Sequence, residues 1–324
     1  MTTYQSQDTP VVFDYPSAVQ LLPVFDADRL REDLNRLSDH RWKLQQNYTT
    51  TGPGRIAPFD WRALPLRSPT GSPERTDPGG AGLDDFADTH WLTEVPYMAE
   101  VLTSLRAPLR SARLLALAPE AKSKVHFEMK IGFPWANLRL HVPITTNPHA
   151  TLTIDGITHQ WRPGTLWFGD FCRWHQVANE GSEPRIHLIV DTTLTPELLD
   201  LFPASFREKL SPDDVLFARP ALPLDEPEQY QGTFEIPLSF TDWEEPDGLF
   251  LEPQQRVAIT TTYEEGRLWV TIDGERRFGL VHLGDGEFRL SGWTDERTLQ
   301  IIPGGSDRIV LRTRQGSTTR ELAL

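Results

Sequence analysis

The sequence predicts a mainly β protein, with a sandwich or barrel as its larger part, helices near the N-terminus and a second β-rich region after it. Between residues 111 and 193, short β-rich runs are separated by Gly, Pro and Asn signals, which is typical of antiparallel sandwiches and barrels. From about Leu222 a second such series begins. A length of 324 residues is enough for two domains of ordinary size.

The composition excludes several classes of protein. The 32 Lys and Arg residues against 46 Asp and Glu give 32 − 46 = −14, so the chain lacks the basic field that nucleic acid binding needs. The single cysteine, Cys172, excludes an intramolecular disulfide and a cysteine-rich metal site. The sequence has no signal-peptide pattern and no stretch approaching the ~20 apolar residues of a membrane span. We therefore expect a soluble, cytoplasmic protein that binds neither nucleic acid nor membrane.

Two helices are expected before the β-rich region. Asp26 is a suitable N-cap for a helix whose Leu30, Leu34 and Leu37 share one apolar face. Residues 96–105 return to helical spacing and begin with a proline. Between the two helices, residues 68–88 are dense in Pro, Gly and Ser. This stretch predicts a mobile loop, either a lid or binding loop or plain disorder.

Six β-rich runs follow, in the order ARLLALAP, SKVHFEMK, LRLHVPITT, ATLTIDG, TLWFGDF and RIHLIVDTT. Thr195 and Pro196 then predict the start of a short helix. The proline-rich stretch 218–227 indicates a linker. We therefore expect one domain over residues 1–217 and an all-β accessory domain over residues 228–324. Its eight expected strands lie within residues 232–240, 257–263, 267–272, 278–283, 287–290, 299–302, 308–312 and 318–322.

The chemistry-bearing residues lie in the first β-rich region. His126 and Glu128 are two residues apart, so on a strand both side chains project from one face. His175 follows in an aromatic strand pattern. Two imidazoles and one carboxylate on one face of a metal leave positions open, as in non-heme Fe(II) oxygenases. Arg185 can present a planar fork to a dicarboxylate.

A second pair, Arg139 and His141, also lies two residues apart and predicts an anion-binding face. Each fragment has a plain structural interpretation as well. His126 and Glu128 would be solvent-facing polar residues, His141 would be a core histidine, and Arg139 and Arg185 would belong to structural ion pairs. Because these motifs follow one another in a set order along the chain, a single functional site is a better explanation than several unrelated coincidences.

These residues resemble the Fe(II)- and 2-oxoglutarate-dependent oxygenases of the aspartyl/asparaginyl β-hydroxylase family, close to bacterial L-proline cis-hydroxylases. The matching stretch, residues 112–191, contains ARLLALAPEAKSKVHFE, LRLHVPITTN and PGTLWFGDFCRWHQVANEGSEPRIHLIVD. The resemblance implies a double-stranded β-helix, that is, a jelly-roll or cupin-like core, with His126, Glu128 and His175 as ligands of Fe(II). It further implies that Arg185 binds the distal carboxylate of 2-oxoglutarate, with His141 and Arg139 in support.

The activity that the resemblance implies is hydroxylation of an unactivated C–H bond of an amino acid, with O2 consumed and succinate and CO2 released. The substrate would be a free, peptidyl or carrier-bound residue. For the substrate pocket we expect a lining of Trp135, Trp167, Phe168 and Trp174, and contacts from Arg67 and the loop 68–88.

Glu128 departs from the family pattern. The proline hydroxylases carry Asp at this position, and the aspartyl β-hydroxylases lack a carboxylate there. Glu is one methylene longer but is still a hard oxygen ligand, so we expect it to bind iron or to lie just off it. Because a carboxylate is present, hydroxylation is favoured over halogenation.

Two other functions stay open at this point. One is a non-catalytic jelly-roll binding protein with a degenerate metal site, and the other is a zinc or manganese cupin-type enzyme, which would have no need of Arg185 as a dicarboxylate anchor. The C-terminal region resembles the small lipocalin-like β domain appended to some serine β-lactamase-type enzymes. We expect it to be a small barrel that contributes packing, the contact of a homodimer or part of the substrate entrance.

Overall fold

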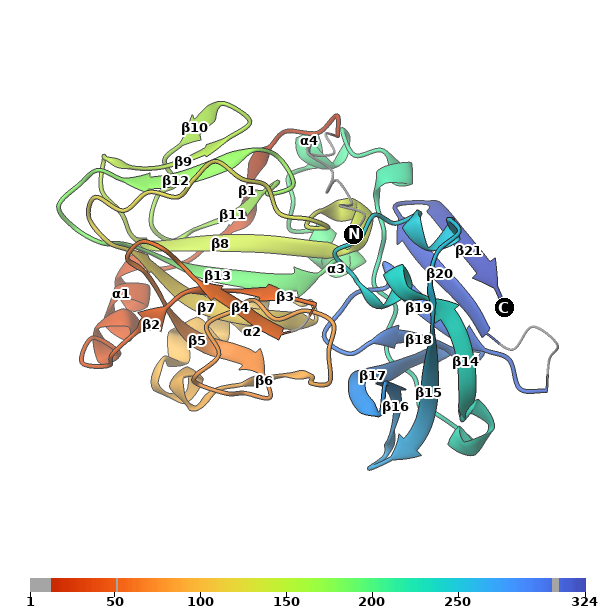
Figure 1. Ribbon diagram of the computed structural model, residues 1–324. Helices are drawn as coiled ribbons and strands as arrows, with labels where there is room; N and C mark the ends of the chain where they lie inside the picture. The colour runs from red at the N-terminus through yellow and green to blue at the C-terminus, as the bar shows by residue number, and fades with distance from the viewer. Residues whose placement is uncertain (1–12, 51, 305–308) are drawn as a thin grey trace.

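The structure, a computed structural model, describes residues 13–50, 52–304 and 309–324. The chain forms two β-rich parts that pack against each other (Figure 1), so the mainly β prediction is confirmed. The described α-helices all belong to the N-terminal part: α1 (Ala27–Arg36), α2 (Pro96–Ser104), α3 (Pro196–Leu199) and α4 (Ala204–Arg207). Within the described residues, no helix is both long and apolar enough to cross a membrane.

The N-terminal part contains two antiparallel sheets that the chain visits in turn. The large sheet has the order β1 (Ala18–Val24), β11 (Thr165–Gly169), β8 (Asn137–Thr145), β13 (Arg185–Thr193), β7 (Leu109–Leu117), β5 (Trp61–Pro69) and β2 (Lys43–Leu44), with β6 (Phe86–Asp88) paired to β5. The small sheet has the order β10 (Ile157–His159), β9 (Ala150–Ile154) and β12 (His175–Asn179). A separate hairpin joins β3 (Gln46–Thr49) to β4 (Gly52–Ile56). Two facing sheets with this crossing pattern make the jelly-roll core that the resemblance implied.

The helices cover one face of the large sheet. Asp26 caps α1 by accepting hydrogen bonds from the backbone N–H groups of Asp28 and Arg29, as expected from the sequence. Leu30 and Met98 bring α1 and α2 into a core that also contains Leu114 of β7. Because side chains alternate along a strand, the neighbours Arg113 and Leu115 face the other way, toward the space between the sheets.

The C-terminal part is a meander of eight strands, each paired with the next: β14 (Gly232–Pro237), β15 (Arg256–Glu264), β16 (Arg267–Ile272), β17 (Glu275–Gly284), β18 (Glu287–Leu290), β19 (Arg297–Ile301), β20 (Ile309–Gln315) and β21 (Thr318–Ala323). All eight expected strands are present. Asp273-Gly274 and Asp285-Gly286 both have positive φ, the conformation of a two-residue hairpin turn. The sheet curls around its own apolar core (Figure 1), and this matches the expected barrel-like shape.

Two expectations about the chain before β8 are wrong. Residues 68–88 are not a mobile loop, because Ser68 and Asp77 are fully buried and Gly82 exchanges backbone hydrogen bonds with the C-terminal part, at Ser291 and Gly279. The run SKVHFEMK is not a regular strand, since within it only an isolated bridge at His126 pairs with β12, and a second bridge lies just before it at Lys122.

A buried ion cluster joins the two parts of the molecule. Lys130 Nζ lies 2.8 Å from Asp247 Oδ1 and 2.9 Å from Glu296 Oε1, and all three side chains are buried. Trp135 Nε1 donates to Asp247 at 3.0 Å, and Trp293 Nε1 donates to Glu296 at 2.7 Å. Lys130 and Trp135 come from the segment before β8, so the cluster ties that segment to loops of the C-terminal part.

We predict that Lys130→Met destabilises the protein by about 3–5 kcal/mol, because it leaves two buried carboxylates without their common cation. Urea unfolding measures the effect. The matched control is Arg277→Met, which removes an exposed pair with Glu275 and should cost less than about 1 kcal/mol. Equal stability of the two variants would contradict the structural role of the cluster.

Candidate metal centre and active-site cavity

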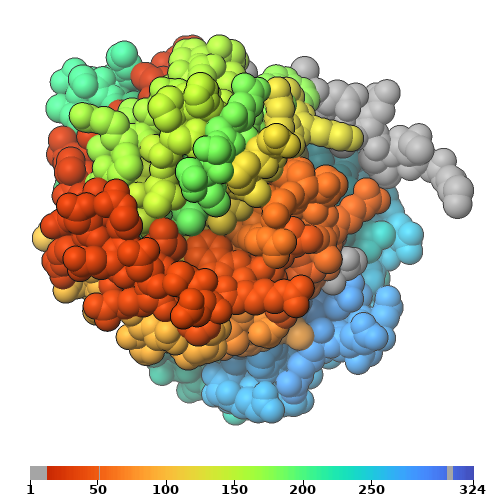
Figure 2. All heavy atoms as spheres, turned by 90° about the vertical axis from the view of Figure 1, so that its left-hand side faces the viewer, coloured from red at the N-terminus to blue at the C-terminus, as the bar shows by residue number. Residues whose placement is uncertain are grey.

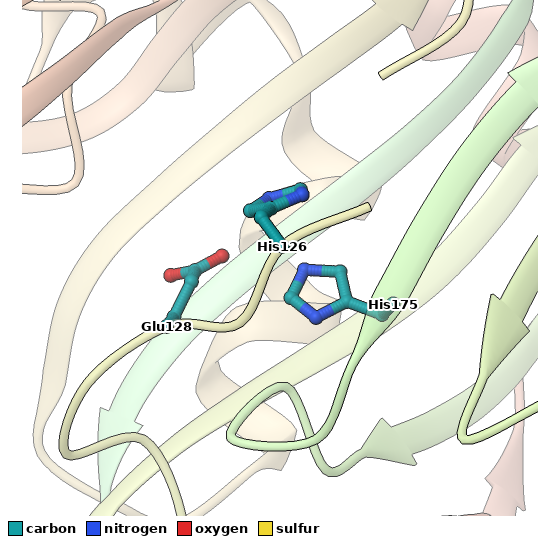
Figure 3. Close-up of side chains that lie close together, drawn as sticks. All are labelled: His126, Glu128 and His175. Carbon is teal, nitrogen blue, oxygen red and sulfur yellow. The ribbon is translucent and has the colours of Figure 1, made fainter. Parts of the chain in front are cut away.

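Three potential metal ligands converge at one end of the jelly roll. The ligand atoms of His126, Glu128 and His175 all lie within 4.8 Å of one another, and Figure 3 shows the three side chains around a common point. His126 and His175 face each other across a bridge, with backbone hydrogen bonds of 2.8 and 3.0 Å. The expected grouping therefore exists, although an irregular segment rather than a strand carries His126 and Glu128.

Both imidazoles are oriented by backbone carbonyls. His126 Nδ1 lies 2.9 Å from Lys124 O, and His175 Nδ1 lies 2.9 Å from Arg173 O. A ring nitrogen bonded to a carbonyl carries the proton, so Nε2 of each ring keeps a free lone pair for a metal. Burial lowers the pKa of His175 to about 4, despite the nearby Glu128 carboxylate, and the ring is neutral at pH 7.

The loop before β12 is held by its own ion pair. Arg173 Nε donates to Asp170 Oδ2 at 2.9 Å, and Asp170 Oδ1 accepts a hydrogen bond from the backbone N–H of Cys172. This pair fixes the carbonyl of Arg173 that orients His175. Asp170 thus acts through the loop and does not touch the imidazole ligands.

Glu128 is positioned by its backbone and by Arg139. Its N–H donates to Phe171 O at 2.9 Å, and Arg139 Nη1 donates to Glu128 Oε1. Oε2 therefore remains available as a ligand, so the residues present fit a divalent metal held by two nitrogens and one oxygen.

Arg139 is committed to carboxylates. Its Nε and Nη2 donate to both oxygens of Asp191, which also accepts hydrogen bonds from Ser111 and Arg113. Burial alone would lower the pKa of Arg139, but Asp191 and Glu128 raise it above its ordinary value. Arg139 thus lies beside the metal ligands as a partner of Glu128 and Asp191, which is the structural interpretation left open by the sequence.

A cavity of about 560 Å³ extends from the three ligands between the sheets and under the C-terminal part. Residues 55–59 form one wall. Figure 2 shows the face of the molecule on which the red and orange N-terminal segments meet the green segments of the small sheet. Trp243, Glu244 and Trp293 of the C-terminal part line it as well. The aromatic lining consists of Tyr48, Phe59, Trp61, Phe127, Phe171, Trp243 and Trp293.

The expected lining was wrong in detail. Trp135 is buried at the interface between the two parts, and Phe168 lies in the core under the helices. Trp167 stacks on Trp161 and is not part of the cavity lining, and Trp174 is exposed. Arg67 is bonded to Asp88 and to backbone carbonyls. The loop 68–88 does reach the cavity, through Pro78 and Gly79.

Arg185 lines this cavity without a partner. It is 3% exposed, and its guanidinium makes no hydrogen bond or ion pair with any residue that the structure describes. Burial lowers its pKa to about 10. An unpaired buried cation is costly, so the position is suited to an anionic ligand that completes the pair.

Two buried histidines neighbour Arg185. His141 lines the cavity and its Nδ1 lies 3.4 Å from Nδ1 of His187. Burial first, and then the charge of Arg185, lower the pKa of both rings well below the usual value. Nε2 of each ring has no hydrogen-bond partner. Both rings are therefore neutral, and His141 can donate or accept one hydrogen bond in the cavity.

The sequence comparisons point to one family. Residues 25–194, 170 of the 324 residues, match the family model described as aspartyl/asparaginyl β-hydroxylase. The matched stretch contains His126, Glu128, His175 and Arg185, and the C-terminal part lies outside it. No curated protein matches the chain.

Three of the solved structures with similarity to the chain are enzymes. One is an oxidoreductase of the 2OG-Fe(II) oxygenase family from Burkholderia pseudomallei, with 10% identity over 55% of this chain and 84% of that one and a TM-score of 0.39. A prolyl-4-hydroxylase from Pseudomonas putida has 14% identity over 55% and 93%, with a TM-score of 0.34. The non-heme α-ketoglutarate-dependent epimerase SnoN of nogalamycin biosynthesis has 14% identity over 65% and 89%, with a TM-score of 0.36.

We predict that the metal-free protein loses stability as the pH falls from 6.5 to 5. His141, His175 and His187 have lowered pKa values in the folded state, whereas in the unfolded chain they titrate near ~6.5. The unfolded state therefore binds more protons in this window, and the free energy of unfolding decreases by up to about 1.4 kcal/mol per pH unit for each histidine.

His187→Phe should remove one of these three contributions, as measured by urea unfolding at several pH values. Its slope should be smaller than that of the wild type by about 1 kcal/mol per pH unit. The exposed His149→Phe is the matched control. A slope for His187→Phe equal to that of the wild type would contradict burial of a neutral His187.

Proposed function

The chain belongs to the aspartyl/asparaginyl β-hydroxylase family and is an oxygenase, and from this premise we propose that it hydroxylates a C–H bond of an amino acid. In this proposal His126, Glu128 and His175 hold Fe(II), and Arg185 holds 2-oxoglutarate. Fe(II) with 2-oxoglutarate supplies the activation of O2, which couples release of succinate and CO2 to hydroxylation of the substrate. The proposal includes the resemblance of these site residues to those of the L-proline cis-hydroxylases.

The observation that carries the proposal is that one cavity holds both a group of three potential metal ligands and a buried arginine without a counter-ion. The three ligand atoms lie within 4.8 Å of one another, and Arg185 lines the same cavity with no counter-ion among the described residues. A dicarboxylate that reaches a metal with one end needs a cation for the other. Such a co-substrate would remove the cost of the buried charge.

The other residues of the site orient the proposed metal ligands and shield the cavity from water. The carbonyls bonded to Nδ1 of both histidines keep Nε2 turned to the metal position. Arg139 holds one oxygen of Glu128 and leaves the other to the metal. Neutral His141 would offer a hydrogen bond to the co-substrate without adding charge. Phe171 and Trp61 exclude water from the wall of the cavity.

The alternative of a non-catalytic binding protein is disfavoured. A degenerate site should have lost either the convergence of its ligands or their orientation. Glu128 instead lies within reach of both imidazoles, and its longer side chain is fixed by Arg139.

Anaerobic calorimetry tests the proposal. The wild type should bind one equivalent of Fe(II), and the loaded protein should then bind 2-oxoglutarate. His175→Ala should lose Fe(II) binding. Arg185→Gln should keep Fe(II) binding and bind 2-oxoglutarate about 10- to 100-fold more weakly, because one charge-assisted bidentate contact is worth roughly 1.5–3 kcal/mol. After admission of O2, succinate should form in the wild type only when Fe(II) is present.

Arg207→Gln is the matched control, since Arg207 pairs with Asp200 on the surface. Arg185→Gln should also leave the stability of the ligand-free protein unchanged or higher, because it removes an unpaired buried charge. A large loss of stability, or wild-type affinity for 2-oxoglutarate, would contradict the role given to Arg185.

A further inference from the structure

Arg110 is a second buried arginine in the cavity that has no carboxylate partner. It is 7% exposed and forms no ion pair with a described residue. Burial lowers its pKa to about 10. Asp191 is the nearby carboxylate that opposes this shift, but Asp191 is already bonded to Arg139, Arg113 and Ser111.

A β-bulge turns Arg110 into the cavity. Val190 of β13 pairs with Ala112 of β7, whereas Thr192 pairs with Leu109. Asp191 therefore lies opposite two residues of β7, Arg110 and Ser111. Without the extra residue, alternation would place Arg110 on the side of Ala112, which faces the helices. Bulges that re-aim a side chain in this way are frequent beside active sites.

The guanidinium of Arg110 is held rigidly with one edge unused. Its Cζ lies 5.0 Å from the ring centre of Trp293 and 5.6 Å from that of Phe86, and Nη1 donates to Asn137 Oδ1 at 2.6 Å. Nε is buried without a partner, and Nη2 makes no hydrogen bond with a described residue. The edge of Arg110 formed by Nε and Nη2 is therefore free to bind a carboxylate. Arg139 uses the same edge of its own guanidinium to bind the carboxylate of Asp191.

Arg110 and Arg185 lie at opposite ends of one strand pair. Arg185 pairs with Leu117 of β7, seven positions along the strand from Arg110. At ~3.3 Å per residue the two backbone positions are roughly 20 Å apart. This backbone separation exceeds the length of a five-carbon dicarboxylate, so a co-substrate held by the metal and Arg185 would leave Arg110 for a different anion.

Two rings of the C-terminal part and Tyr48 of β3 form an aromatic wall of the cavity near Arg110. The rings of Trp243 and Trp293 lie 4.5 Å apart, and Tyr48 stacks on Trp243 at 6.3 Å. All three rings line the cavity. They offer apolar surface next to the cation, which suits an organic acid whose body packs against aromatic faces.

We propose that Arg110, with the aromatic wall of Tyr48, Trp243 and Trp293, forms the substrate subsite and binds the free carboxylate of an amino acid. This inference rests on the proposed function and narrows its substrate class. A free α-carboxylate is present in a free amino acid, whereas a carrier-bound residue has lost it to a thioester or ester. The C-terminal part then acts in substrate recognition.

Calorimetry on the full chain loaded with Fe(II) and 2-oxoglutarate, without O2, tests the subsite. The probes are the twenty L-amino acids and the carboxamides of those that bind. In the wild type, an amino acid that binds should do so about 10- to 100-fold more tightly than its carboxamide. Arg110→Gln should remove this preference, weakening the acid and leaving the carboxamide unchanged. Arg110→Lys should restore part of the preference.

The exposed Arg277→Gln is the matched control and should behave as the wild type. Affinity of 2-oxoglutarate should be the same in Arg110→Gln and the wild type, which separates this subsite from Arg185. Equal binding of acid and carboxamide by the wild type, or no binding of any amino acid by protein that binds 2-oxoglutarate, would overturn the subsite alone. Failure to bind 2-oxoglutarate at all would overturn the proposed function and the subsite together.

Discussion

The active-site cavity depends on the buried carboxylate of Asp191. Both of its oxygens accept hydrogen bonds from Arg139, and it also accepts hydrogen bonds from Arg113 and Ser111. Arg113 and Arg139 together lower the pKa of Asp191 far below its usual value, against the effect of burial. Because Asp191 fixes Arg139, and Arg139 holds Glu128, the position of the third proposed metal ligand follows from this one carboxylate on β13. The β-bulge opposite Asp191 turns Arg110 into the same cavity.

The distribution of charge is compatible with the proposed binding of anions by an acidic chain. The net charge of −14 lies elsewhere, and among the buried cations of the cavity only Arg110 and Arg185 lack a carboxylate of their own in the part of the chain described. Burial makes each of them expensive to leave unpaired. In the proposal, Arg185 at one end of the β7–β13 pair would bind 2-oxoglutarate, and Arg110 at the other end would bind the carboxylate of the amino acid. The proposed metal ligands lie in the same cavity between the sheets.

Much of this architecture was predictable from the sequence, and the failures have physical causes. The cap at Asp26, the leucine face of α1 and the eight C-terminal strands follow from local patterns. β5 was missed because Pro65 and Pro69 weaken its strand signal. The grouping of His126, Glu128 and His175 was predicted, but the partner of Arg139 was not, since Asp191 reaches it across the sheet. The orientation of Arg110 depends on a bulge, and the contribution of Trp243 and Trp293 depends on how the two parts pack. No local pattern encodes either.

A crystal structure grown without O2, with Fe(II), 2-oxoglutarate and a bound amino acid, tests this division of roles most directly. The account predicts iron on Nε2 of both histidines and on Glu128, the distal carboxylate of 2-oxoglutarate on Arg185, and the carboxylate of the amino acid on Arg110. Density for 2-oxoglutarate on Arg110, with Arg185 still unpaired, would contradict it.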